Sequence, residues 1–277
     1  MIKEKIKLFS ELIRLKNCLM AGIGAIIGYF IALNYFILDF NLILIFLSVF
    51  FVCAGGQAIN DYFDSEIDAK VSKNKPIPSK RITKKEVLEL SIFLFLAGIS
   101  VSFFINFILF LTAIAFSILL IVYAAVLYKV KYVGNLVVAL STAFTFIFGA
   151  MATNNLPQLV ILFAISAFFA NTSREIIKDI EDLKKDKGFK KTLPMISLKA
   201  SNILPLIYYA ASIIIGFSAF IFFNLNLMYL ILFIIATVII LLSSKFLVEK
   251  NYNKSQKFAK LAMFVMLLAY IVSIIRF

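Results

Sequence analysis

Residues 60–68, with the sequence NDYFDSEID, place four acidic side chains directly after an apolar run. In a helix Asp61, Asp64 and Asp68 occupy positions i, i+3 and i+7, within about 60° of one another at roughly 100° per residue, while Glu66 points elsewhere. Clustered carboxylates next to lipid are costly, at about 2.5–3.5 kcal/mol for each acid on insertion scales. A hard divalent cation with oxygen ligands compensates for such a cluster, and Mg²⁺ fits this role.

The same spacing of aspartates, D-x-x-D-x-x-x-D, returns in the second half of the chain at Asp179, Asp182 and Asp186. An apolar run precedes each copy, and Pro76 and Pro194 follow the two copies at the same distance. One copy alone is equally well interpreted as a solvated acidic helix end. Two matched copies in a chain with only 15 Asp and Glu residues indicate an internal repeat with a shared function.

The composition predicts a polytopic α-helical membrane protein. The chain is 62% hydrophobic with a mean hydropathy of +1.00, and apolar stretches of about 20 residues recur throughout. These runs are continuous and lack strand-period alternation, which argues against a β-barrel. The lysine-rich start leads into a full-length span, so we expect no cleavable signal peptide. The two cysteines predict no disulfide or metal framework, and the absence of histidine effectively excludes imidazole catalysis and zinc chemistry as function classes.

The apolar runs predict about nine spans in one bundle around a central cavity that opens to the cytoplasmic side. Their approximate bounds are 17–38, 42–59, 87–105, 107–127, 134–151, 157–172, 202–223, 226–244 and 258–275. The run from 91 to 128 is too long for one helix, and Asn106 is the expected turn. We expect a single domain of two pseudo-repeat halves, about 17–130 and 131–245, followed by a ninth helix.

Basic residues set the expected orientation. With nine spans, every Lys and Arg except Arg276 falls on one side, which the positive-inside rule makes cytoplasmic. Both aspartate motifs then lie on that side and can converge on one cavity. The net charge of +13 follows from this topology, so nucleic-acid binding needs no separate hypothesis. The sequence gives no indication of the oligomeric state.

Two facing carboxylate clusters in loops rich in Lys and Arg suit a polyanion carried with divalent metal, and a diphosphate is the natural candidate. The acids hold Mg²⁺, the metal bridges diphosphate oxygens, and basic side chains neutralise the remaining charge. Such a site stabilises diphosphate as a leaving group when a C–O bond breaks. Because the site opens into a membrane-embedded bundle, a long hydrocarbon is expected as the organic part of the substrate.

At this point the motifs resemble those of a known family. Residues 60–68, followed by KPIPS at 75–79, are similar to the first signature of the UbiA family of intramembrane prenyltransferases. Residues 174–186, followed by TLP at 192–194, resemble the second signature. The resemblance implies nine helices, Mg²⁺ dependence and transfer of a prenyl group from a prenyl diphosphate to an acceptor.

The resemblance also implies roles for individual residues. Catalytic roles are expected for Asp64, Asp68, Asp182 and Asp186. The expected metal-binding set adds three residues to these four: Asn60, Asp61 and Asp179. The expected diphosphate-binding set consists of polar and basic residues near the motifs: Asn60, Lys75, Tyr123, Lys129, Arg174 and Lys178.

Some of these assignments compete with plainer ones. Lys75 stands where the family usually has Arg, and this change loosens bidentate phosphate contact. Lys129 and Tyr123 are equally well explained as a topology-setting lysine and an interfacial tyrosine. Glu175 shares the second acidic face by spacing, and we interpret it as structural.

The acceptor is the least constrained part of the hypothesis. An aromatic acceptor of quinone or haem biosynthesis would need apolar walls, whereas a lipid phosphate would need extra cations near the membrane surface. Residues 14–22, 60–68, 134–140 and 145–149 look most like the archaeal branch of the family, which implies transfer of geranylgeranyl to geranylgeranylglyceryl phosphate in ether-lipid synthesis. Two other classes are disfavoured. A CDP-alcohol phosphotransferase needs one continuous motif that neither copy has, and a cation transporter would place acids near mid-span.

Overall fold

The computed structural model describes residues 2–127, 130, 132–183, 188 and 191–275, and the described chain is α-helical with no strand. Nine helices in these ranges are long and apolar enough to span a membrane, which confirms the predicted number. They are α2 (Leu15–Leu33), α3 (Phe40–Val71), α4 (Lys84–Phe103), α5 (Phe107–Ala125), α6 (Val133–Met151), α7 (Gln158–Glu181), α10 (Leu198–Phe222), α11 (Leu227–Val248) and α12 (Tyr252–Val272). Two shorter helices complete the described set, α1 (Ile2–Leu12) and α9 (Leu193–Ile196).

The chain divides into two compact units, and α2 contributes to both. Unit 1 comprises Met1–Ile26 and Leu38–Tyr128, and unit 2 comprises Ile27–Ile37 and Lys129–Phe277. Each unit therefore contains one of the two aspartate motifs. The pseudo-repeat of two four-helix halves stays a prediction.

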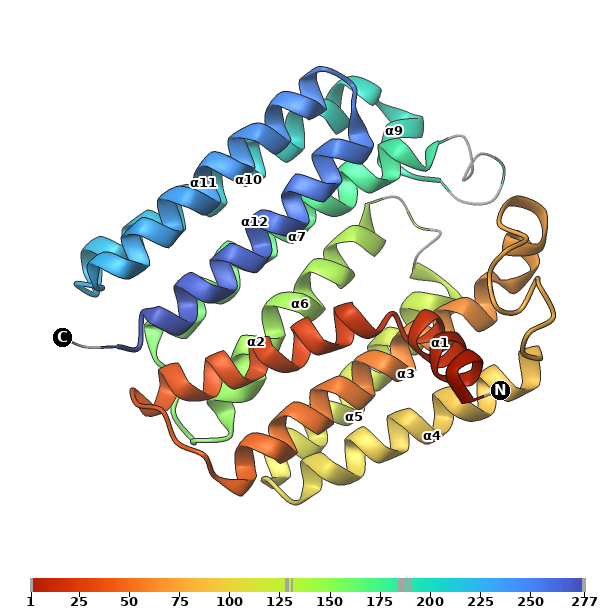
Figure 1. The fold of residues 1–277 in the computed structure, drawn as a ribbon, viewed down its shortest axis with the longest axis horizontal. Helices are drawn as coiled ribbons and strands as arrows, with labels where there is room; N and C mark the ends of the chain where they lie inside the picture. The colour runs from red at the N-terminus through yellow and green to blue at the C-terminus, as the bar shows by residue number, and fades with distance from the viewer. Residues whose placement is uncertain (1, 128–129, 131, 184–187, 189–190, 276–277) are drawn as a thin grey trace. The chain divides into compact units, whose positions relative to one another are not determined.

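In unit 1, α3 and α4 pack side by side along their length (Figure 1). Small and hydroxylated residues allow this close approach, since Ser48 Oγ donates to the carbonyl of Gly98 at 3.0 Å and Ser91 Oγ donates to that of Gly55 at 2.9 Å. A Cβ atom at Gly98 would lie 2.9 Å from the Ser48 carbonyl oxygen. The α3–α4 contact consequently requires glycine at this position.

In unit 2, α7 packs against α6, α10 and α12, and α11 lies beside α12 (Figure 1). Aromatic rings fill the centre of this unit. The Phe163 and Tyr270 rings stack with centroids 3.9 Å apart, and buried Tyr229 donates its hydroxyl to the carbonyl of Gly216 at 2.8 Å. The tyrosine hydroxyl in the apolar interior is thereby satisfied.

Helix starts follow ordinary capping chemistry. Asn106 is the N-cap of α5 and accepts from the Leu109 amide at 2.8 Å, which confirms the turn predicted there. Thr83 and Glu86 form a capping box at the start of α4. These caps fix where α4 and α5 begin.

Several helix bounds differ from the predicted spans. Helices α3 and α7 continue to Val71 and Glu181, about three turns beyond the predicted ends, because the backbone hydrogen bonding continues where the apolar run stops. Helix α12 begins at Tyr252, earlier than predicted. Helix α1, an amphipathic helix ahead of the first span, was not predicted at all.

The outer surfaces of these helices are apolar. In the most apolar window of α5 the mean hydropathy is 2.7, yet only 22% of the window is buried. Water would not tolerate so much exposed hydrocarbon, whereas a bilayer of about 30 Å core thickness does. The chain is accordingly a multi-pass membrane protein.

Candidate active site

The first aspartate motif lies on the last turns of α3, so its predicted helical conformation is confirmed. Asp61 and Asp68 are each 6% exposed, and Asp64 is half-buried. The Glu66 side chain is 88% exposed, as expected from its position on another side of the helix. The helix thus buries two acids of the motif and leaves Glu66 in solvent.

Two basic side chains from other segments of unit 1 compensate for these buried carboxylates. Lys75 Nζ lies 2.7 Å from Asp68 Oδ2 and 3.9 Å from Asp61 Oδ1. Arg14 Nη2 lies 3.2 Å from Asp61 Oδ1. A buried carboxylate without such partners would carry a large desolvation cost, so the arrangement explains how the acids are tolerated.

Local backbone conformation places both basic residues. Helix α3 ends at Val71, the Ser72 amide donates to the Asp68 carbonyl at 2.8 Å, and the following turn brings Lys75 back over the motif. Arg14 joins α1 to α2 with a positive φ of 49°, an uncommon conformation for a residue other than glycine. This turn directs the guanidinium toward Asp61.

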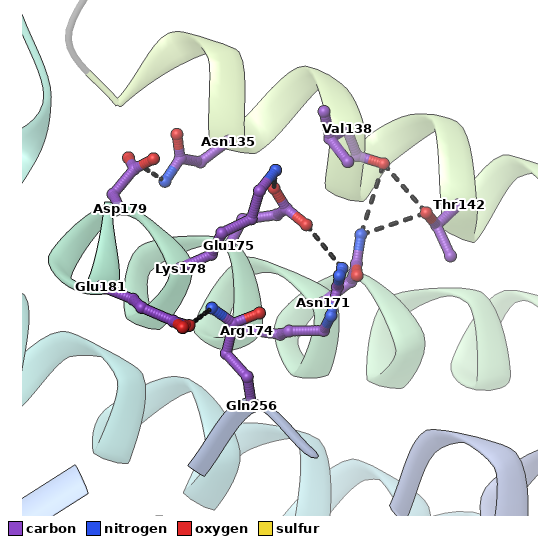
Figure 2. A network of polar contacts seen from close by, with 10 residues as sticks. All are labelled: Asn135, Val138, Thr142, Asn171, Arg174, Glu175, Lys178, Asp179, Glu181 and Gln256. Carbon is purple, nitrogen blue, oxygen red and sulfur yellow. Dashed lines mark hydrogen bonds and ion pairs between the residues drawn. The ribbon is translucent and has the colours of Figure 1, made fainter. Parts of the chain in front are cut away.

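The second motif lies at the end of α7 in unit 2. Asp179 is 8% exposed and accepts from Asn135 Nδ2 of α6 at 2.9 Å (Figure 2). Asp182 is the C-cap residue of α7 and is half-buried. Asp186 lies outside the described residues. The described part of this motif therefore consists of one buried and one half-buried aspartate.

Arg174 and Lys178, both expected to bind diphosphate, contact one buried acid on their own helix. Arg174 Nη1 lies 2.6 Å from Glu175 Oε1, and Lys178 Nζ lies 3.2 Å from Glu175 Oε2 (Figure 2). Within the described part of the chain the Nε atom of Arg174 is buried and has no hydrogen-bond partner. A buried guanidinium donor without an acceptor is unusual and marks a place where an anion would be favoured.

The other expected site residues occupy separate places. Asn60 is half-buried on α3 and Tyr123 is half-buried on α5, both in unit 1. Lys129 lies outside the described ranges. Whether these residues bind substrate stays a prediction.

Three residues of these clusters were not assigned to the site from the sequence: Arg14, Asn135 and Glu175. For Glu175 a signal existed, since the R-E-x-x-K pattern places a lysine at i+3 on the same helix face. Asn135 is a polar residue in an apolar helix and is 9% exposed. Arg14 offered no local signal, because its partner lies far away in the sequence.

The donor atoms present suit a hard cation. Among the described residues no group of three or more acidic, cysteine or histidine side chains is gathered closely enough to form a metal cage. Mg²⁺ is commonly held by one or two carboxylates together with substrate phosphates rather than by a protein cage. The buried aspartates of each motif suit Mg²⁺ binding by a few carboxylates together with a substrate phosphate.

Among the described residues, nine helices can span a membrane, and each unit has a motif with buried aspartates at the end of one such helix, paired with Arg14 and Lys75 in unit 1 and with Asn135 in unit 2. These features define a multi-pass membrane protein with buried acids at two helix ends. The model of the UbiA prenyltransferase family matches residues 21–268. The chain belongs to this family, and the resemblance first drawn from the motifs is confirmed.

Similar proteins agree with this membership. The chain is 36% identical over 278 residues to the digeranylgeranylglyceryl phosphate synthase of Methanocaldococcus jannaschii, covering 99% of this chain and 98% of that protein. A solved structure described as giving insights into the biosynthesis of digeranylgeranylglyceryl phosphate synthase in membranes has a TM-score of 0.80 at 34% identity, with 99% and 100% of the two chains covered. A UbiA homolog from Archaeoglobus fulgidus bound to GPP and Mg²⁺ shares the fold, with a TM-score of 0.68 at 18% identity over 94% and 99% of the chains.

Proposed function

We propose that this protein transfers a geranylgeranyl group from geranylgeranyl diphosphate to the free hydroxyl of geranylgeranylglyceryl phosphate, which yields digeranylgeranylglyceryl phosphate. The observation that carries the proposal is the similarity of nearly the whole chain to the synthase of that name from Methanocaldococcus jannaschii. The polar clusters of both units are consistent with this chemistry.

In this proposal the donor diphosphate binds at the aspartate motifs. Asp61, Asp64 and Asp68 of the first motif and Asp179, Asp182 and Asp186 of the second, with Asn60, supply oxygen ligands for Mg²⁺. When bound, Mg²⁺ neutralises the charge that develops on the departing diphosphate. The fold shared with the Archaeoglobus fulgidus homolog that binds GPP and Mg²⁺ supports this assignment.

Basic residues take part of the diphosphate charge. Arg14 and Lys75 pair with Asp61 and Asp68, and both could donate to phosphate oxygens if these carboxylates held Mg²⁺. The unpartnered Nε of Arg174 supports a similar role in unit 2, where the group can donate to a phosphate oxygen.

The reaction forms one ether bond and breaks one phosphoester bond. The bond between C1 of the prenyl chain and the diphosphate oxygen breaks, and the electron pair leaves with the diphosphate. The acceptor hydroxyl oxygen donates an electron pair to C1, and its proton passes to the released diphosphate. Positive charge on the allylic carbon develops in an apolar helix bundle, which excludes water as a competing nucleophile.

The site faces the cytoplasm in this proposal. The excess of Lys and Arg in the loops that contain both motifs supports this orientation through the positive-inside rule. The hydrocarbon chains of both substrates then lie among the membrane spans, and their phosphate groups remain at the surface.

Product analysis tests the acceptor. Protein purified in detergent is given geranylgeranyl diphosphate and Mg²⁺ with either geranylgeranylglyceryl phosphate or 4-hydroxybenzoate, and the products are identified by mass spectrometry. We expect the diether product only, and D182N protein should form little of it. Prenylated benzoate without diether product would contradict the proposed acceptor and favour an aromatic substrate.

A further inference from the structure

An ion pair joins α1 to the loop that follows α3. Arg81 Nη1 donates to Glu11 Oε2 at 2.7 Å, and Arg81 Nη2 donates to Glu11 Oε1 at 3.0 Å. The planar guanidinium and the carboxylate therefore meet in the bidentate geometry that is the strongest for this pair. The two residues are 70 positions apart in the sequence, and their contact connects two segments that flank the first aspartate motif.

The same guanidinium organises the loop that carries Lys75. Arg81 Nη2 also donates to the Asn74 carbonyl at 2.7 Å, and Arg81 Nε donates to Ser79 Oγ at 2.9 Å. Ser79 Oγ in turn donates to the Lys75 carbonyl at 2.7 Å. Arg81 thus contacts the loop on both sides of Lys75, whose ammonium group lies against Asp68.

Glu11, the acidic partner of the ion pair, lies at the end of α1, three residues before Arg14. Leu12 and Ile13, which follow Glu11, are 1% and 0% exposed. Leu12 packs in a cluster that includes Ile77 of the loop, so the helix end and the loop already share an apolar contact. Because apolar contacts are not directional, the ion pair supplies the orientation that this packing lacks.

We propose that Glu11 and Arg81 form a positioning clasp that holds Arg14 and Lys75 over the buried aspartates of the first motif. This inference rests on the proposed function, because the role of Arg14 and Lys75 in donor binding is part of it. Neither Glu11 nor Arg81 touches the aspartates; each acts through its neighbour. Helix α1 therefore helps to position the basic residues of the donor site.

The clasp predicts a defined kinetic pattern. Loss of either partner leaves Lys75 and Arg14 present but less well oriented, so KM for geranylgeranyl diphosphate should rise while kcat changes little. We expect E11Q and R81Q each to raise this KM about fivefold, which corresponds to ~1 kcal/mol, the upper end for a partly exposed pair. The double variant E11Q/R81Q should raise this KM no more than R81Q alone, because Glu11 acts only through its contact with Arg81.

A second measurement follows the loop without using turnover. Trypsin cleavage after the exposed Lys73 and Lys80 should be faster in E11Q than in the wild type, and both cleavage sites are intact in that variant. Glu249→Gln is the matched control, since it removes an exposed acid near Lys245 in unit 2. This control should alter neither KM nor cleavage.

These readouts separate failure of the clasp from failure of the proposed function. If the wild type transfers the prenyl group while E11Q has unchanged KM and unchanged cleavage, the clasp is overturned. Additive effects of the two single changes would also overturn it. If the wild type transfers no prenyl group, the proposed function fails, and the cleavage rates alone then support the clasp by increasing or overturn it by staying constant.

Discussion

The ammonium nitrogen of Lys75 lies 2.7 Å from the Oδ2 atom of Asp68. The same nitrogen is 3.9 Å from Oδ1 of Asp61, so one cation lies between two carboxylates of the motif. Lysine is a compact point charge on a flexible stem, which allows it to serve both acids and to move when a phosphate arrives. The lysine in place of the arginine usual in the family therefore suits this geometry.

Replacing Lys75 with alanine removes the charge between two aspartates that are each 6% exposed. Because this change leaves buried carboxylates under-compensated, we expect K75A to lower the free energy of unfolding by about 1–3 kcal/mol. K75R retains the charge, so its free energy of unfolding should fall by less than that of K75A. Denaturant unfolding in detergent measures the difference, with K73A as the control for loss of an exposed lysine from the same loop. Equal stabilities of K75A and K73A would contradict the importance of the contact.

Asp64 and Asp182 are predicted to supply metal-binding oxygens. Converting either to asparagine removes charge needed to hold Mg²⁺ on the diphosphate, so kcat/KM should fall by roughly two to three orders of magnitude without loss of fold. Chelation of divalent metal should abolish turnover of the wild type, and added Mg²⁺ should restore it. E66Q removes an acid from the exposed side of the same helix and should keep normal activity. Wild-type rates in D64N or D182N would refute the site assignment.

The Glu11–Arg81 pair predicts a pH dependence of stability. Hydrogen bonds from Arg81 hold the pKa of Glu11 below its ordinary value of 4.5, and the charges of Arg81 and Lys7 act in the same direction. A lowered pKa in the folded state means that the stabilisation is present above pH 4.5 and is lost as pH falls through the folded-state value. The difference in Tm between the wild type and E11Q should therefore shrink on acidification below pH 4.5. A difference that stays constant would contradict the contribution of this pair.

The predicted orientation can be tested by labelling. Single cysteines at Ser79 and Ser197, in a protein without Cys18 and Cys53, should react with a membrane-impermeant maleimide from the cytoplasmic side only. A cysteine at Asn155 should react from the opposite side. These outcomes follow from the distribution of Lys and Arg over the loops. Opposite accessibility of the first two positions would exclude a cavity shared by the two motifs.

The sequence predicted the parts of the fold that depend on local physics. A span needs about 20 apolar residues, so hydropathy identified the nine membrane helices, and the amide of Asn106 marked the turn between two of them. The helical period placed Asp61 and Asp68 on one face, and both contact Lys75. The ends of α3 and α7 were missed because hydropathy falls at the first polar residues, whereas the backbone hydrogen bonds of the helix continue through them.

The partners of the buried acids could not be predicted in the same way. Arg14 reaches Asp61 only because the turn between α1 and α2 has a left-handed residue, and nothing local to Arg14 indicates that turn. Asn135 reaches Asp179 across the packing of α6 on α7. Which cation or amide meets which carboxylate is decided by tertiary packing between segments far apart in sequence.

Glu175 is the acid that lies against Arg174 and Lys178 in unit 2. If these two cations bind diphosphate, Glu175 competes with the substrate for them, because both anions need the same donors. E175Q should then lower thermal stability without ligand, since the buried Arg174 side chain loses a charged partner.

In the presence of inorganic diphosphate and Mg²⁺, E175Q should gain more than the wild type. We expect E175Q to bind this probe about five- to tenfold more tightly than the wild type, or ~1–1.4 kcal/mol, and to gain more in Tm on binding. Glu181→Gln is the matched control, because Glu181 accepts from the neutral side chains of Asn253 and Gln256 near the same helix end. Isothermal titration of the three proteins measures the affinities. Equal affinities of E175Q and E181Q for diphosphate would show that Arg174 and Lys178 serve only to stabilise α7 and do not contact the donor.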